Sequence, residues 1–198
     1  MLRRKRTPYF DAALANVRSK QPRFFAAVVA DARMTSMMRS EPWEYRGPVD
    51  ASLRALRLMW ITDGFLALVM YRAQSRLDVL RVPVLPRLAH RLAIMIGDLY
   101  IGETALVHPG VFIGHGMVVI DGFVEVSSGV RIAPGVTIGL RGSARGPTIE
   151  RDVLIGTGAK VLGELTVGRG ARIGANAVVL SDVPPGATAV GVPARITD

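Results

Sequence analysis

Residues 149–179 read IERDVLIGTGAKVLGELTVGRGARIGANAVV, and every sixth residue of this stretch is isoleucine or valine. The same spacing extends back to residue 101, at Ile101, Val107, Ile113, Ile120, Val126, Ile132, Ile138, Ile149, Ile155, Val161, Val167, Ile173 and Val179. Four residues after most of them comes a second small or branched apolar residue: Ala105, Val111, Val124, Val130, Val136, Val153, Ala159, Ala171 and Ala177. Neither a helix nor an alternating strand gives a six-residue period. The spacing predicts a β-solenoid of hexapeptide repeats, each repeat forming one flat side of a coil.

Two interruptions of this period indicate where function is placed. Seven residues separate Ile113 from Ile120, and eleven separate Ile138 from Ile149. Regular repeats are scaffold, whereas insertions in a solenoid usually carry the binding or catalytic residues. We therefore expect an irregular corner at GHGMVV, residues 114–119, and a loop that leaves the coil at GLRGSARGPT, residues 139–148.

The first half of the chain reads as helical. A helix is expected directly after Pro22, followed by a loop marked by the prolines and the glycine of residues 41–48. Asp50 is the predicted N-cap of one long helix that continues to about residue 77, and a shorter helix should cover residues 85–97. The long helix is apolar on nearly all sides between residues 56 and 71, which indicates burial in a subunit interface. We predict two domains, a helical one over residues 1–97 and the coil over residues 98–198.

Composition limits the chemistry. The 198-residue chain contains no cysteine, which excludes disulfides, thiolate nucleophiles and cysteine-based metal sites. Its formal net charge of +9 suits an anionic ligand, such as a cofactor phosphate, a nucleic acid or a lipid surface, but solvated arginines spread over the surface would give the same value. The basic start does not read as a signal peptide, and the most apolar window is too short to span a bilayer. We expect a cytoplasmic protein without an integral membrane segment.

Several motifs resemble the serine acetyltransferase branch of the hexapeptide-repeat acyltransferases. They are FIGHGMVVI at 112–120, VTIGLRGSARGPTIERDVLIGTGAKVLG at 136–163, LTVGRGARIGANAVVLSDVPPGATAVGVPARI at 165–196 and, more weakly, PVLPRLAHRLA at 83–93. The resemblance implies an α+β fold in which a left-handed parallel β-helix follows a helical domain. It also implies a trimeric catalytic unit with acetyl-CoA as donor and active sites between neighbouring coils. Together with the apolar flanks of the coil, the apolar segment 56–71 predicts a homotrimer or a dimer of trimers.

On the acceptor side, the resemblance makes His115 the catalytic histidine. An acceptor hydroxyl that attacks a thioester needs a base near neutral pH, and histidine meets this demand. The family's acid before this histidine is Gly114 here, and the carboxylate expected to orient the imidazole aligns with Tyr100. Asp98, two residues earlier, is the candidate replacement on the same strand face. Arg145 is retained to meet an acceptor carboxylate, although the family's second active-site histidine is Gly146 here, so we expect slow turnover with serine.

The donor side is better preserved. By resemblance, the pantetheine arm bonds to the backbone near Gly139 and Ala159, where small side chains permit a close approach, and Ala171 lies near the adenine. The candidate phosphate ligands are three bases: Lys160, Arg172 and Arg195. No metal is expected.

The main reading is therefore acetyl transfer to a small hydroxyl acceptor, with L-serine as the best guess and O-acetylserine for cysteine synthesis as the product. A sugar or another small metabolite is the alternative acceptor, and a non-catalytic trimeric scaffold or a basic membrane- or nucleic-acid-binding protein is the alternative class. A zinc hydratase would need about three histidines, whereas the coil holds only His108 and His115. No aromatic platform supports nucleic acid binding.

Some features are given no role. His108 falls at an ordinary corner, His90 reads as a partly exposed helix residue, and the basic run Arg3–Arg6 reads as a disordered arm. Many family members end in a tail that docks onto the next enzyme of cysteine synthesis. Because this chain stops two residues after Ile196, we do not expect that cysteine synthase complex.

Overall fold

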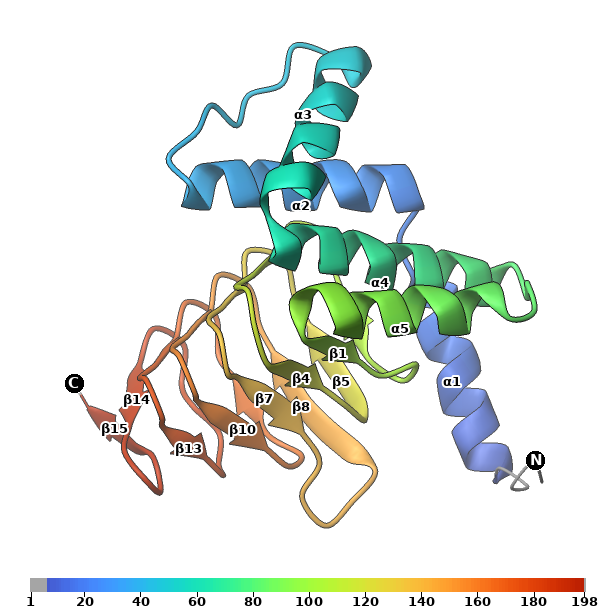
Figure 1. Ribbon diagram of the computed structural model, residues 1–198. Helices are drawn as coiled ribbons and strands as arrows, with labels where there is room; N and C mark the ends of the chain where they lie inside the picture. Colours follow the sequence, from blue (N-terminus) through green and yellow to red (C-terminus); the bar gives the residue numbers. More distant parts are fainter. Residues whose placement is uncertain (1–6, 198) are drawn as a thin grey trace.

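The structure, a computed structural model, describes residues 7–197 (Figure 1). The basic run at residues 3–6 lies outside the described residues. Five helices precede the coil in this part of the chain: α1 Pro8–Lys20, α2 Phe24–Met38, α3 Pro48–Ile61, α4 Asp63–Val79 and α5 Leu85–Gly97. Helices α4 and α5 lie side by side across one end of the coil, and α2 crosses above α4 (Figure 1). None of the described helices is long and apolar enough to cross a membrane.

The helices expected after Pro22 and over residues 85–97 are confirmed, but the single helix from Asp50 is wrong in two respects. Gly47 caps α3 and Pro48 begins it, so Asp50 lies in the first turn, where its carboxylate accepts hydrogen bonds from the backbone of Arg46 and the side chain of Arg54. The helix also ends at Ile61, because Thr62 is extended at φ −142° and ψ 99°. A new helix, α4, starts in another direction at Asp63, and this break brings its first turn against the coil.

The coil consists of short strands that stack in three parallel sheets, one along each side. The first sheet is β1 Leu99–Ile101, β4 Val118–Ile120, β7 Thr137–Gly139, β10 Lys160–Leu162 and β13 Val178–Val179. The second sheet is β2 Leu106–Val107, β5 Phe123–Val126, β8 Arg145–Ile149 and β11 Thr166–Val167. The third sheet is β3 Phe112–Ile113, β6 Arg131–Ile132, β9 Leu154–Ile155, β12 Arg172–Ile173, β14 Thr188–Val190 and β15 Arg195–Thr197, the last of which is antiparallel. A parallel β-helix behind a helical region is thus confirmed as the fold class.

The six-residue period gives the core of the coil. All thirteen aliphatic residues at these positions are at most 4% exposed, and the second inward set is equally buried. The register pairs each with its counterpart one turn away, for example Ile120 with Ile138 and Ile132 with Ile155. Each such side chain contributes about 1.5–3 kcal/mol on burial, so the stacked column stabilises the coil along its whole length.

The expected loop at residues 139–148 is only half correct. The chain turns at residues 140–144 and then returns as β8, which pairs with β5 across an irregular register at Phe123. Arg145 is therefore a strand residue. Gly146 is buried, and a Cβ at this position would lie 2.5 Å from the Val124 side chain.

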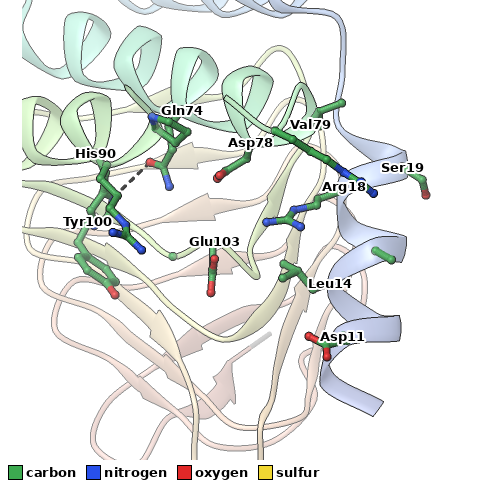
Figure 2. A pocket seen from close by; sticks show the side chains of 15 residues that line it. Asp11, Leu14, Arg18, Ser19, Gln74, Asp78, Val79, His90, Tyr100 and Glu103 are labelled. Atoms are coloured by element: carbon green, nitrogen blue, oxygen red, sulfur yellow. Dashed lines mark hydrogen bonds between the residues drawn. The ribbon is translucent and has the colours of Figure 1, made fainter. Parts of the chain in front are cut away.

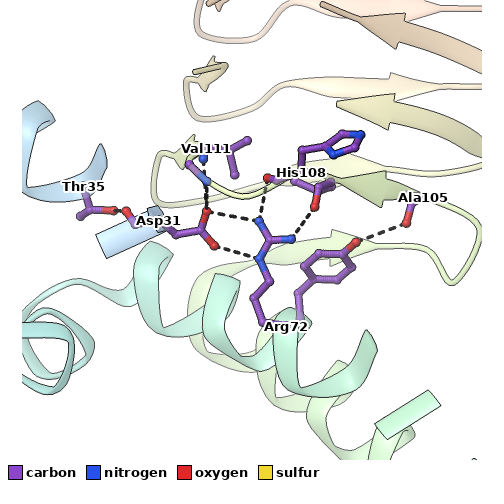
Figure 3. Close-up of polar contacts among 9 residues, drawn as sticks. Asp31, Thr35, Arg72, Ala105, His108 and Val111 are labelled. Atoms are coloured by element: carbon purple, nitrogen blue, oxygen red, sulfur yellow. Dashed lines mark hydrogen bonds and ion pairs between the residues drawn. The ribbon is translucent and has the colours of Figure 1, made fainter. Parts of the chain in front are cut away.

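A buried ion pair ties the helices to the first turn of the coil (Figure 3). The carboxylate of Asp31 on α2 pairs with Arg72 of α4 at 2.8 Å, and the two side chains are 1% and 2% exposed. Asp31 also accepts backbone N–H bonds from Gly110 at 2.8 Å and Val111 at 3.2 Å, while Arg72 donates to the carbonyls of Val107 and His108. Burying two charges is tolerated here because both are paired and hydrogen-bonded.

Helix α5 ends at Gly97 and β1 begins at Leu99. The two parts share one apolar core, since Ala67, Leu68, Tyr71 and Ala93 of the helices belong to the cluster that fills the coil. The division into domains 1–97 and 98–198 stays a prediction.

Candidate active site

His115 lies at the irregular corner between β3 and β4, where the seven-residue spacing predicted it. Gly116 and Met117 turn the chain there with φ of 93° and 51°, and the extra residue pushes the corner outward, leaving the His115 side chain 64% exposed. Gly114 packs against the next turn of the coil, because a Cβ at this position would lie 2.8 Å from the Pro134 ring. An acidic side chain does not fit at 114 unless Pro134 moves.

The first turn of α4 presses against this corner. A Cβ on Gly64 would lie 2.9 Å from the carbonyl oxygen of Ile113 and 3.3 Å from the backbone nitrogen of His115, so glycine is what permits this approach. The neighbouring residue, Asp63, places its Oδ2 4.0 Å from Nδ1 of His115. Sequence reasoning missed this neighbour; a charged residue beside a glycine inside an otherwise apolar window was the available signal.

Asp98, the predicted orienting carboxylate, lies close to the same corner. It ends α5 in the left-handed conformation at φ 48°, and its carbonyl accepts a hydrogen bond from Val118 at 3.1 Å. Its side chain is exposed, and the carboxylate that the described residues bring within 4.0 Å of His115 is that of Asp63. Asp98 as a catalytic residue stays a prediction.

Arg145 and His115 lie at different edges of the coil. Arg145 is at the edge between the first and second sheets, and His115 is at the edge between the third and first sheets. His115 precedes the strand β4 of that sheet, whereas Arg145 follows the sheet's strand β7 and forms an ion pair with Glu164 at 3.0 Å. A cavity of about 500 Å³ beside Arg145 is lined by α1 and the second sheet. A single chain therefore does not bring the predicted base and the predicted carboxylate ligand together.

 The predicted donor residues lie at three different edges of the coil. Ala159 is buried at the edge that carries His115, directly before β10, where its N–H donates to Gly156 and its carbonyl accepts from Thr137. Gly139 is buried as the last residue of β7, and Ala171 is buried before β12. Lys160 already donates to the carbonyl of Gly135 at 2.7 Å and to the hydroxyl of Thr137 at 3.0 Å. The two arginines of the predicted set, Arg172 and Arg195, are exposed on the third sheet.

The edge between the third and first sheets is continuous from His115 to Ala159 and Lys160. The backbone of Gly135 donates to Gly116, that of Gly158 donates to Pro134, and that of Asn176 donates to Thr157. His115 and Ala159 therefore lie on one column of corners, with Lys160 on one flank and Arg172 on the other.

A cavity of about 1070 Å³ lies elsewhere, between α1, the end of α4, α5 and β1 (Figure 2). Tyr100 lines it, with its ring edge-on to His90 at 5.1 Å between centroids. Nδ1 of His90 lies 3.2 Å from Oε1 of Gln74, and burial lowers the pKa of His90 and raises that of Tyr100. His90 is thus the half-buried helix residue that the sequence predicted, and the cavity contains none of the predicted catalytic residues.

No group of three or more histidine, aspartate or glutamate side chains placed to hold a metal ion occurs within residues 7–197. A parallel β-helix of hexapeptide repeats, with one histidine exposed at an irregular corner, is the architecture of a hexapeptide-repeat transferase. A family model described as bacterial transferase hexapeptide (six repeats) matches residues 146–181.

Comparison with known proteins identifies the branch. The serine acetyltransferase of Helicobacter pylori strain J99 is 45% identical over 142 residues, which are 70% of this chain and 83% of that protein. The serine acetyltransferase of Mycobacterium tuberculosis is 36% identical over 167 residues, 82% of this chain and 73% of that protein. The chain belongs to the serine acetyltransferase family, as its motifs indicated.

Solved structures agree with this assignment. A serine acetyltransferase in complex with CoA superposes with a TM-score of 0.75 at 29% identity, covering 94% of this chain and 75% of that one. The enzyme of Neisseria gonorrhoeae in complex with serine gives 0.71 at 30% identity, covering 94% and 72%. Other relatives are longer: the match spans 62% of the Synechococcus elongatus protein and 46% of the Bacillus licheniformis protein.

Proposed function

We propose that this protein transfers the acetyl group of acetyl-CoA to the hydroxyl of L-serine, with His115 as general base. The observation that carries the proposal is the exposed imidazole at the irregular corner, at the head of a column of small residues, in a chain of this family. Related structures hold CoA in one case and serine in another, which supports both substrates.

In the proposed reaction, a ring nitrogen of His115 takes the proton of the serine hydroxyl as its oxygen attacks the thioester carbonyl carbon. The new C–O bond forms, the C–S bond breaks, and the imidazolium returns its proton to the departing CoA thiolate. The chain's own contribution is to hold the base beside the acceptor and to bind the donor along the backbone of the corner column. Arg172 and Arg195 are the exposed bases that would meet the donor phosphates.

The distribution of the residues favours an active site shared between chains. Arg145 and His115 lie at opposite edges of the first sheet, so a neighbouring coil must supply one of them if both contact the same acceptor. We propose a homotrimer, or a dimer of trimers, that acts in the cytoplasm and supplies O-acetylserine for cysteine synthesis.

The test is acceptor-dependent release of CoA thiol by the full chain. His115→Ala should lose about two to four orders of magnitude in kcat, the usual effect of removing a positioned base. Binding of acetyl-CoA, measured by calorimetry, should change little. Full activity in His115→Ala would contradict the mechanism.

Arg145 distinguishes the acceptors. The ion pair between Arg145 and Glu164 is the observation that favours a neutral acceptor such as a sugar. The charge of the guanidinium is already compensated by the Glu164 carboxylate, so it does not need an acceptor carboxylate. If serine is the acceptor, Arg145→Ala should raise its KM while kcat changes less, and a neutral acceptor in the same panel should be unaffected. A loss confined to neutral acceptors would reject serine.

A further inference from the structure

The feature that extends the proposed function is the carboxylate of Asp63 beside the imidazole of His115. The two positions where the family carries an acid near this histidine are Gly114 and Tyr100 in this chain. Neither residue has a carboxylate that could accept a hydrogen bond from the imidazole. The Pro134 ring fills the space that a side chain at 114 would need, as the 2.8 Å contact of a Cβ there shows.

The break between α3 and α4 brings a different acid to this place. Asp63 is the first residue of α4, and its Oδ2 lies 4.0 Å from Nδ1 of His115. Both side chains are more than half exposed, at 61% and 64%, so a small rotation of either is free to close the gap to hydrogen-bond distance. Catalytic hydrogen bonds are often long before substrate binds and shorten in the reactive complex.

Backbone packing fixes the spacing of the two residues on both sides. Gly64 lets α4 approach the carbonyl of Ile113 and the amide of His115 closely, because a Cβ at this position would lie only 2.9 Å from that carbonyl oxygen. The amide of Gly116 donates to the carbonyl of Gly97 at 3.4 Å, and a Cβ on Gly97 would lie 3.1 Å from the carbonyl oxygen of Asp63. The corner, the start of α4 and the end of α5 therefore pack directly against one another and carry both side chains.

We propose that Asp63 is the positioning residue of this active site, accepting a hydrogen bond from Nδ1–H of His115 and so leaving Nε2 unprotonated towards the acceptor hydroxyl. A carboxylate at Nδ1 fixes the tautomer of the ring and stabilises the imidazolium that forms when the proton is taken. The role lost at Gly114 and Tyr100 is thus taken by a helix of the N-terminal part of the chain. This inference rests on His115 as general base.

The test compares Asp63→Asn with Asp63→Glu and Asp98→Asn in the full chain. Asp63→Asn should lower kcat about tenfold to a hundredfold, the range expected when a catalytic group is misplaced, with the KM values for acetyl-CoA and serine nearly unchanged. Asp63→Glu should restore part of the loss, because it keeps the carboxylate. Glu44→Gln, an exposed acid of the α2–α3 loop, is the matched control and should leave activity unchanged.

Two further measurements separate positioning from other roles. In the His115→Ala background, adding Asp63→Asn should cause no further loss, because residues that act as a unit are not additive. The ¹⁵N shifts of His115 should show a smaller Nδ1–H population in Asp63→Asn before any acceptor is added. A rise in the KM for serine with unchanged shifts would overturn the proposal by making Asp63 an acceptor ligand.

The outcomes also distinguish this inference from the proposed function. If His115→Ala keeps its activity, the function fails. If His115→Ala loses activity while Asp63→Asn does not, or if Asp98→Asn costs more than Asp63→Asn, only the positioning role of Asp63 fails.

Discussion

Two glycines explain, at the scale of single residues, how this active site departs from its family. Gly114 stands where the family has an acid and Gly146 where it has a second histidine, and each meets a side chain of the adjacent turn, Pro134 in one case and Val124 in the other. The space for the larger residues is therefore occupied by the coil itself. The sequence showed which residues were missing, but the neighbours that exclude them lie 20 and 22 positions away and became visible only in the fold.

His90 leads to a prediction about pH. Burial lowers its pKa from the ordinary 6.5, opposed by the charge of Asp78, while Gln74 and Tyr100 contact its ring. Since the unfolded chain then binds the proton more readily, the stabilising effect of neutral His90 is complete above pH 6.5 and is lost as the pH falls below that value. Urea unfolding at pH 7.5 and at about pH 5.5 should show a smaller decrease for His90→Gln than for the unchanged chain. An equal decrease in both proteins would reject this assignment.

At the scale of elements, the attachment of α2 and α4 to the coil depends on the pair Asp31–Arg72. Arg72→Met should lower the free energy of unfolding by about 3–5 kcal/mol, because it leaves a buried carboxylate without its counter-charge. The control is Arg54→Met, which breaks the partly exposed pair with Asp50 and should change stability much less. Denaturant unfolding at one fixed protein concentration measures both. Equal effects of the two substitutions would show that the buried pair is not what fastens the helices.

The same elements show what the sequence could and could not predict. Every coil residue that the six-residue period named is buried, since burial there depends mainly on position within a repeat, but the period did not name Leu99, Leu106 and Val118, which are buried too. It also located His115. The break at Thr62 was missed, because helix propensity favours continuation and the reason for stopping is the contact of Gly64 with a corner about fifty residues further on. Asp63 could not be assigned to the site without that contact.

At the scale of the whole molecule, the uncovered face of α3 predicts assembly. Its apolar residues follow a helical spacing and are far more exposed than core residues: Val49 73%, Leu53 63%, Leu56 59% and Trp60 89%. Such a contiguous apolar face marks a protein interface. The predicted burial of residues 56–71 in a subunit interface is wrong for most of the segment, because Leu58, Phe65 and Leu68 are buried within one chain. Leu56 and Trp60 are not buried, and a second copy of the same face is the occupant that fits the proposed dimer of trimers.

Light scattering should therefore give three or six times the mass of one chain. If the native assembly is a hexamer through α3, the double substitution Leu53→Glu and Trp60→Glu should reduce it to a trimer that still transfers acetyl groups, because the proposed shared sites lie between coils. Leu80→Glu, an equally accessible apolar position at the end of α4, should leave the mass unchanged. A stable monomer at micromolar concentration with full activity would contradict both the assembly and the division of one active site between His115 of one chain and Arg145 of its neighbour.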